Sequence, residues 1–335
     1  MNDAFLRNLF SRVVKVVDGF LDEKYRSFAI SLLVPTVMRG GSGAVAYLMS
    51  DVANLIERVP RREVRAFLLG DCGLRLAAAG RVAEAEEAFR RALDDLKEAG
   101  ERAGEVFTKM AVRMAEAAVT SGQRRFIDMI FEGLPYADAF SRAVAVGAAT
   151  VGLCALRSEE FEEALSMLVE VTKMLAVPSK CVKVLVEVAW WLARMGVYEK
   201  GRMLLEEALK WARRGAQDER DKLLMKVARG FLRVAEAVNS AEDVEKAFMV
   251  ASEVENAHGR SWVESDVVKV FVRLRGGGRR EKLERARIMA GRITEKTVKA
   301  WTMRDVAASL FEEGLVEDAV KVLREAAEVA RSIFS

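Results

Sequence analysis

Histidine is nearly absent from this chain of 335 residues, which contains one, His258. A single histidine excludes every metal site that needs two imidazole ligands, including the zinc-binding HExxH helix. The three cysteines, Cys72, Cys154 and Cys181, lie far apart and form no CxxC pair. We therefore expect reduced thiols in a cytoplasmic protein rather than a disulfide framework or a zinc site.

Proline, aromatic residues and side-chain amides are also scarce. Four prolines and 7% aromatic residues argue against an all-β or low-complexity chain, and 51% hydrophobic residues exclude a disordered one. Five Asn, two Gln and 36 Arg against 17 Lys are typical of a thermophile. The net charge of +3 does not by itself require a nucleic-acid partner.

No segment has the pattern of a signal peptide or a membrane span. Asp3 and Arg7 occupy the N-terminal stretch where a signal peptide has its apolar core. The uncharged run from Ala143 to Leu156 has 14 residues, too few to cross about 30 Å of hydrocarbon as a helix. We expect no membrane association.

Apolar residues recur at spacings of three and four along most of the chain, and short breaks interrupt them at regular intervals. The recurring turn position has a mean spacing of 39 residues and falls at Gly80, Gly122, Glu159, Gly196, Glu242, Glu281 and Gly314. Gly40 marks a divergent first repeat. A period in this range is typical of stacked helix–turn–helix units.

Three of these units resemble the tetratricopeptide repeat family, which has small residues, a large apolar residue and a turn glycine at set offsets. The matching residues are Gly73, Leu76, Gly80, Ala85, Phe89 and Ala92; Ala189, Leu192, Gly196, Tyr198, Leu205 and Ala208; and Ala307, Leu310, Gly314, Ala319, Leu323 and Ala326. Gly201 stands where the family has Ala. The period exceeds the family's usual one in most units, and other helical-hairpin repeats remain alternatives.

The sequence therefore predicts an all-α fold, a right-handed α-solenoid of about eight helix–turn–helix hairpins with a tetratricopeptide-like superhelix. We expect residues 1–61 to form a divergent N-terminal cap or first repeat, and residues 62–335 to form one elongated repeat array.

Catalytic motifs are missing. The glycine runs at 40–43 and 276–278 follow no strand and are interpreted as linkers, not phosphate loops. The acidic cluster Asp94–Glu98 has no second cluster to share metal ions with, and His258 is interpreted as an exposed histidine in a linker. We expect no catalytic, metal or cofactor site, and hence no enzyme.

The resemblance implies a concave groove lined by the first helix of each unit. The implied groove positions are Lys109, Val112, Arg113 and Glu116; Lys183, Val186, Glu187, Trp190 and Arg194; Arg229, Leu232, Arg233 and Glu236; and Trp301, Arg304, Asp305 and Ala308. Basic side chains outnumber acidic ones there, which predicts binding of an acidic or mixed peptide segment through Arg forks and a Trp anchor. An ordinary solvated charged face is the alternative.

A second basic feature surrounds a glycine-rich turn and comprises Arg273, Arg275, Arg279, Arg280 and Lys282. Such a cluster predicts phosphate contacts, and Arg pairs at 61–62, 124–125 and 213–214 could extend it into a stripe along an RNA backbone. Scattered surface charge is the alternative interpretation.

We therefore predict a non-catalytic adaptor or scaffold that binds a protein partner in its groove, with an RNA- or ribonucleoprotein-associated factor as the alternative. The last helix suggests a homodimer. If Val320, Leu323, Ala327 and Ala330 pack on the preceding helix, the stripe of Val322, Ala326, Val329 and Ile333 is left uncovered.

Overall fold

The computed structural model describes residues 3–18, 29–30, 33, 48, 52–100, 103–276 and 278–333. All of its regular elements in these ranges are helices, which confirms the predicted all-α solenoid. The chain divides into two compact units, residues 1–174 and 175–335. The predicted boundary at residue 61 stays a prediction, and Gly40 lies outside the described residues.

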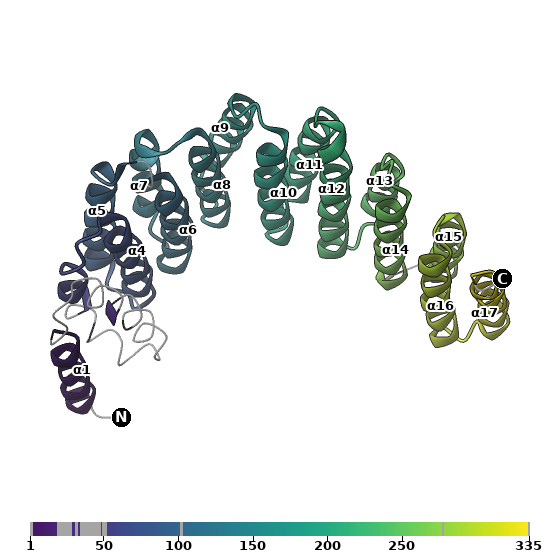
Figure 1. The fold of residues 1–335 in the computed structure, drawn as a ribbon, viewed down its shortest axis with the longest axis horizontal. Helices are drawn as coiled ribbons and strands as arrows, with labels where there is room; N and C mark the ends of the chain where they lie inside the picture. Colours follow the sequence, from purple (N-terminus) through teal and green to yellow (C-terminus); the bar gives the residue numbers. More distant parts are fainter. Residues whose placement is uncertain are drawn as a thin grey trace. The chain divides into compact units, whose positions relative to one another are not determined.

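The first unit begins with helix α1 (Asp3–Asp18), and its residues from 62 onward form three helical hairpins within the described part of the chain. The hairpins are α4 (Arg62–Ala78) with α5 (Val82–Lys97), α6 (Ala103–Ser121) with α7 (Arg125–Gly133), and α8 (Ala139–Ala155) with α9 (Phe161–Met174). A short 3-10 turn, η2 (Leu134–Tyr136), follows α7. The first helices of the hairpins pack in series, α4 on α6 and α6 on α8 (Figure 1).

The second unit repeats this arrangement four times. Its hairpins are α10 (Pro178–Arg194) with α11 (Tyr198–Arg213), α12 (Gln217–Val238) with α13 (Ala241–Ser252), α14 (Ala257–Arg273) with α15 (Arg279–Arg292), and α16 (Lys296–Glu312) with α17 (Val316–Arg331). Helices α10, α12, α14 and α16 pack side by side in that order. We call the first helix of each hairpin the A helix and the second the B helix.

Small residues let the two helices of a hairpin approach closely. Ala85 and Ala319 are fully buried at the A–B contact of their hairpins. At the equivalent Gly201, a Cβ atom would lie 2.8 Å from the backbone oxygen of Ala189. The α10–α11 pair is therefore too close even for alanine, which explains the departure from the family pattern at this position.

Six of the hairpins share one turn geometry. A residue with positive φ ends the A helix, and the next N–H donates to the carbonyl oxygen five residues earlier, as in Arg81 to Leu76 at 2.9 Å. The six positive-φ residues are Gly80, Gly122, Arg157, Gly196, Asn239 and Gly314. Such a cap satisfies carbonyl groups that the helix end leaves without partners.

Two of the predicted turn positions are wrong, and one is displaced. Glu242 and Glu281 lie inside α13 and α15, because the positive-φ turn residues are Asn239 before α13, and Gly276 and Gly278 before α15. Glu159 lies between α8 and α9 as predicted, but Arg157 adopts the left-handed conformation. Where the turn carries no glycine at the expected offset, the sequence marks its place poorly.

Buried ion pairs add to the apolar core within each unit. Arg65 of α4 binds both carboxylate oxygens of Asp95, and Arg202 of α11 binds both of Asp243 at 2.7 Å. Both aspartates are less than a tenth exposed. Bidentate pairs of this kind fix the rotation of one helix against the next. Among the described residues, no helix combines the length and apolar character needed to cross a membrane.

The prediction for the last helix, α17, is wrong about which of its two apolar stripes packs on the preceding helix. Val322 and Ala326 are buried with Ala319 in the contact with α16, whereas Val320 and Leu323 are 38% and 45% exposed. The rotation of α17 is set by the small residue Ala319, which must face α16.

Candidate functional site

The predicted groove positions of the second unit lie on one row of helices. Lys183, Glu187, Trp190 and Arg194 are on α10, Arg229 and Arg233 on α12, and Trp301 and Arg304 on α16. All of them are exposed or half-buried. We call the exposed side of α10, α12, α14 and α16 the A face.

A cluster of two tryptophans and two arginines occupies the start of the A face. The rings of Trp190 and Trp191 lie 4.9 Å apart, and the Arg194 guanidinium lies 5.1 Å and 5.3 Å from their centroids. Arg233 from α12 lies 5.6 Å from the Trp190 ring. Trp190 is half-buried and Trp191 is 40% exposed, so neither ring belongs fully to the core. Cation–π contacts hold this cluster together.

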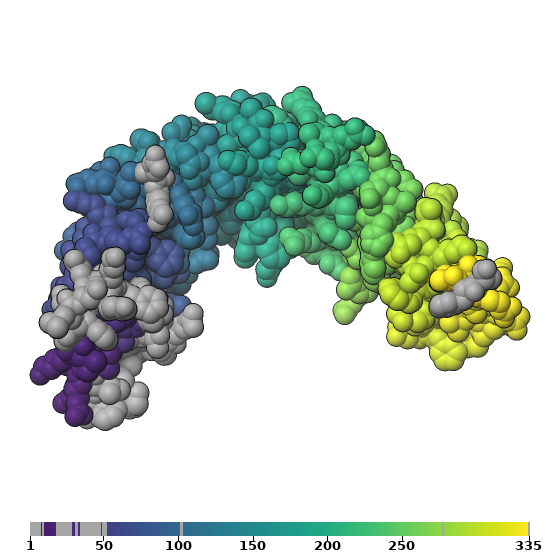
Figure 2. Space-filling model, in the orientation of Figure 1, coloured from purple at the N-terminus to yellow at the C-terminus, as the bar shows by residue number. Residues whose placement is uncertain are grey.

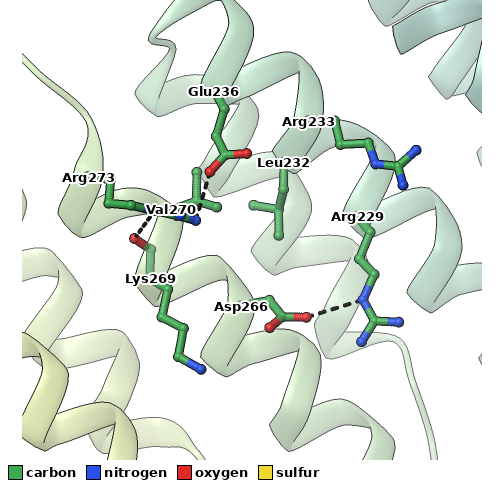
Figure 3. Close-up of a pocket in the computed structure, with 8 residues that line it drawn as sticks. All are labelled: Arg229, Leu232, Arg233, Glu236, Asp266, Lys269, Val270 and Arg273. Carbon is green, nitrogen blue, oxygen red and sulfur yellow. Dashed lines mark hydrogen bonds and ion pairs between the residues drawn. The ribbon is translucent and has the colours of Figure 1, made fainter.

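A hollow of about 220 Å³ lies between α12 and α14. Leu232 and Val270 line it, and two ion pairs cross it, Arg229 with Asp266 at 3.2 Å and Arg273 with Glu236 at 2.7 Å. Figure 3 shows the two partners of each pair turned toward each other, while the Arg233 and Lys269 side chains extend away from the hollow in opposite directions. Pockets for drug-sized ligands have about 300–1,000 Å³, so this hollow suits one side chain rather than a cofactor.

Positive charge is in excess around this hollow. Lys226 and Lys269 make no side-chain hydrogen bond or ion pair within the described residues. The ion-pair partner of Arg233 is Glu187, at the long distance of 3.9 Å. Burial lowers the pKa of Lys226, and the charges of Lys183 and Arg233 lower it further against the opposing effect of Glu187. An acidic group from outside the chain would relieve this repulsion.

The far end of the A face carries an aromatic cluster that the sequence analysis missed. Trp262 and Trp301 have ring centroids 6.1 Å apart, and Trp301 is 50% exposed. The Trp262 indole N–H donates to Nε2 of His258 at 3.2 Å, and Nδ1 of His258 lies 2.6 Å from Glu295. Because an indole nitrogen can only donate, Nε2 accepts and Nδ1 carries the proton.

His258 is exposed as predicted, but the interpretation of its segment as a linker is wrong, because α14 begins at Ala257. A signal for the aromatic cluster was present. Trp262 and Trp301 are 39 residues apart, which is one mean repeat, and His258 precedes Trp262 by one helical turn.

The two basic groove residues predicted in the first unit, Lys109 and Arg113, have partners within the chain. The Arg113 guanidinium binds Asp71 of α4 and lies 4.5 Å from the Phe67 ring centroid. Lys109 lies 2.9 Å from Glu105 and 5.7 Å from the same ring. These two side chains stabilise the packing of α6 on α4.

The predicted phosphate-binding residues do not form one cluster. Arg273 lies on the A face, whereas Arg279 donates to the carbonyl groups of Val272 and Leu274 and contacts Glu313 at 2.8 Å. Lys282 donates to the carbonyl of Arg275 at 2.7 Å, and Arg280 lies 3.4 Å from Asp318. Arg279 and Lys282 therefore hold the turn before α15 in place.

The arginine pairs at the other turns are also paired with acidic residues, except for Arg214, which lies over the Trp211 ring. Arg124 binds Glu160, Arg125 binds Glu86, and Arg213 lies 2.6 Å from Glu253 of the next hairpin. Arg61 lies 2.5 Å from Glu63, and Arg62 lies 2.5 Å from Glu98. Neutralised in this way, they offer little positive charge for a phosphate backbone.

The acidic cluster and the cysteines lie in ordinary structural environments. Asp94 and Asp95 bind Lys97 and Arg65 rather than facing a second acidic cluster, and no described group of three His, Cys, Asp or Glu is arranged to hold a metal ion. Burial raises the pKa of the Cys72 thiol to about 12, and burial also raises the pKa of Cys154 and Cys181. These groups are thiols and not reactive thiolates at neutral pH.

No protein-family model and no curated protein sequence matches the chain. Similar solved structures include Ton1535 from Thermococcus onnurineus, with 14% identity and a TM-score of 0.36 over 90% of this chain and 96% of that one. A circular tandem repeat protein has 13% identity and a TM-score of 0.38 over 99% and 92% of the two chains.

A signal transduction ATPase from Pyrococcus horikoshii, described as having a tetratricopeptide repeat sensor, has 18% identity and a TM-score of 0.32. The alignment covers 92% of this chain and 52% of that one. At these TM-scores the superpositions are loose.

Proposed function

We propose that this protein is a non-catalytic adaptor of the tetratricopeptide-like type, which binds an acidic segment of a partner protein on its A face. The observation that carries this proposal is the combination, on one row of helices, of exposed tryptophans with weakly paired cations, of which Arg233 has Glu187 at 3.9 Å and Lys226 has no ion-pair partner among the described residues. Tryptophan and arginine dominate the energetics of protein interfaces.

Stacked helices favour this use because the side chains are already held in place before the partner arrives. Trp190 is fixed by Arg194 and Arg233, and Trp262 by His258. A preformed surface loses little conformational entropy on binding. Excess positive charge would attract an acidic segment and orient it during the encounter.

The RNA alternative has less support. Most arginines of the basic turn and of the turn pairs contact a carboxylate or a backbone carbonyl, and Arg280 is the most exposed of those at the turn, with 77% of its side chain accessible. Phosphate binding needs cations that can exchange their counterions for phosphates.

Affinity capture from a lysate of the source organism, with and without ribonuclease, tests the proposal. We expect a partner that survives nuclease, is captured by the Arg280→Gln control, and is lost with the double variant Trp190→Ala/Arg194→Ala. Because Trp190 is half-buried, Arg233→Glu provides a second variant that removes no core packing. Equal capture by all four baits, or capture abolished by ribonuclease, would contradict the proposal.

A further inference from the structure

The last helix carries an exposed apolar stripe. Val316, Val320 and Leu323 of α17 are 48%, 38% and 45% exposed, and Ala327 and Ala330 continue the same side of the helix. The spacings of four, three, four and three residues place all five within one narrow sector. Figure 2 shows this last hairpin, in yellow, in space-filling form.

Equivalent positions in earlier hairpins are stacking positions. When Ala85, Gly201 and Ala319 are aligned, Leu323 corresponds to Phe89 and Leu205, which are both fully buried. Phe89 packs on Phe126 of the following hairpin, with ring centroids 5.4 Å apart.

Leu205 likewise packs on the following hairpin. A Cβ atom added to Gly230 of α12 would lie 2.7 Å from its Cδ2 atom. The stripe on α17 is therefore a surface of the kind on which a helix stacks, and no described helix covers it. Exposed apolar patches of this kind mark interaction surfaces.

Exposed charges run along one side of the stripe. Glu317, Arg324 and Arg331 follow one another at intervals of seven residues and thus share one edge of the helix. No hydrogen bond or ion pair joins their side chains to any other described residue, and all three are exposed. On the other side of the helix, Asp318 and Glu325 do have partners, because they form ion pairs with Arg280 and Arg287.

We infer that this stripe is a self-association surface, covered by α17 of a second copy of the chain in antiparallel orientation. A twofold axis near Leu323 would place Val316 on Ala330 of the partner, Val320 on Ala327, and Leu323 on itself. The same axis brings Glu317 beside Arg331 of the partner subunit, twice per dimer. A parallel pair would instead place the edges that carry Glu317 and Arg331 on opposite sides of the interface, where these charges could not meet.

The expected dimer is weak. A helix of 16 residues is about 24 Å long, so one helix from each copy covers less than the roughly 1,200 Å² of a standard stable interface. We expect a concentration-dependent equilibrium with a micromolar dissociation constant.

Charge exchange tests the partner and its orientation together, by sedimentation velocity across the micromolar range. Glu317→Arg and Arg331→Glu should each raise the dissociation constant about tenfold. An equimolar mixture of the two should restore dimers, because both pairs are then opposite in charge. Arg324 would lie beside its own copy, so Arg324→Gln should tighten the dimer. A chain that stays monomeric throughout, or a mixture that behaves as its components do, would overturn the inference.

A cysteine placed at the proposed twofold axis of the dimer tests the inference independently of the charge variants. Leu323→Cys should form a dimer linked by a disulfide under mild oxidation, whereas Ile288→Cys on α15, which is equally exposed at 47%, should not. The unmodified chain controls for Cys72, Cys154 and Cys181. Equal cross-linking of both variants would contradict the inference. Neither test involves the A face, so its result is independent of the proposed function.

Discussion

The A helices of the two units use the same architecture differently. In the first unit, Arg113 and Lys109 are paired with acidic residues, and the middle of α8 presents the half-buried, uncharged Val144, Ala148 and Val151. In the second unit, α12 presents Lys226 and Arg233 with weak or no pairing. Exposed tryptophans therefore distinguish the second row of A helices from the first, and under the proposed function they mark the row that binds.

The largest expected effect on stability separates Arg113, which is closely paired within the chain, from Arg233, which is only weakly paired. Arg113→Gln should lower the free energy of unfolding by about 2 kcal/mol, because Asp71 loses its partner in a contact where both side chains are about four-fifths buried. Arg233→Gln should change it by less than about 0.5 kcal/mol, because that side chain is 53% exposed. Urea denaturation of both variants measures the difference. Equal losses would remove the distinction between the two rows.

Buried carboxylates differ between the units in a similar way. Asp95 is bound by Arg65, whereas Oε2 of the buried Glu264 has no hydrogen-bond partner among the described residues. Burial raises the pKa of Glu264, and Arg260 opposes this only in part. Ionised Glu264 therefore destabilises the fold at neutral pH.

Glu264→Gln should stabilise the protein by about 1 kcal/mol at pH 7. A raised folded-state pKa means that the wild type loses stability as the pH rises from about 4.3, the value for an unfolded glutamate, through the folded-state value. The advantage of the variant should accordingly vanish near pH 4. Melting temperatures across this range check the sign, and a variant less stable at pH 7 would show that Glu264 has a favourable partner.

Much of the fold could be predicted from the sequence because its determinants are local. The positions that match the repeat family, such as Leu76, Ala85 and Gly80, set a helix, a close contact and a turn within a few residues of each other. In the structure, Leu76 and Ala85 are buried and Gly80 has positive φ, as their spacing predicts. The turns without glycine at the expected offset were the ones placed wrongly.

The site was less predictable because pairing depends on residues one repeat away. Arg113 contacts Asp71, 42 residues earlier, and Arg213 contacts Glu253, 40 residues later. Family offsets placed Trp190, Arg194 and Arg233 on one face. They could not show that Arg279 and Lys282 turn back to backbone carbonyl groups.

The smallest expected effects concern two turns that lack glycine. Arg157 and Asn239 both have positive φ, at 55° and 56°, but only Asn239 also binds the next hairpin, through Oδ1 and Nδ2 to the backbone of Arg275. Arg157→Gly should stabilise its unit by about 0.5 kcal/mol, because glycine adopts this conformation without a steric cost. Asn239→Gly should destabilise by about 0.5 kcal/mol, because two hydrogen bonds outweigh that gain. Opposite shifts in urea midpoint would support this difference, whereas shifts of the same sign would mean that the Asn239 contacts contribute little.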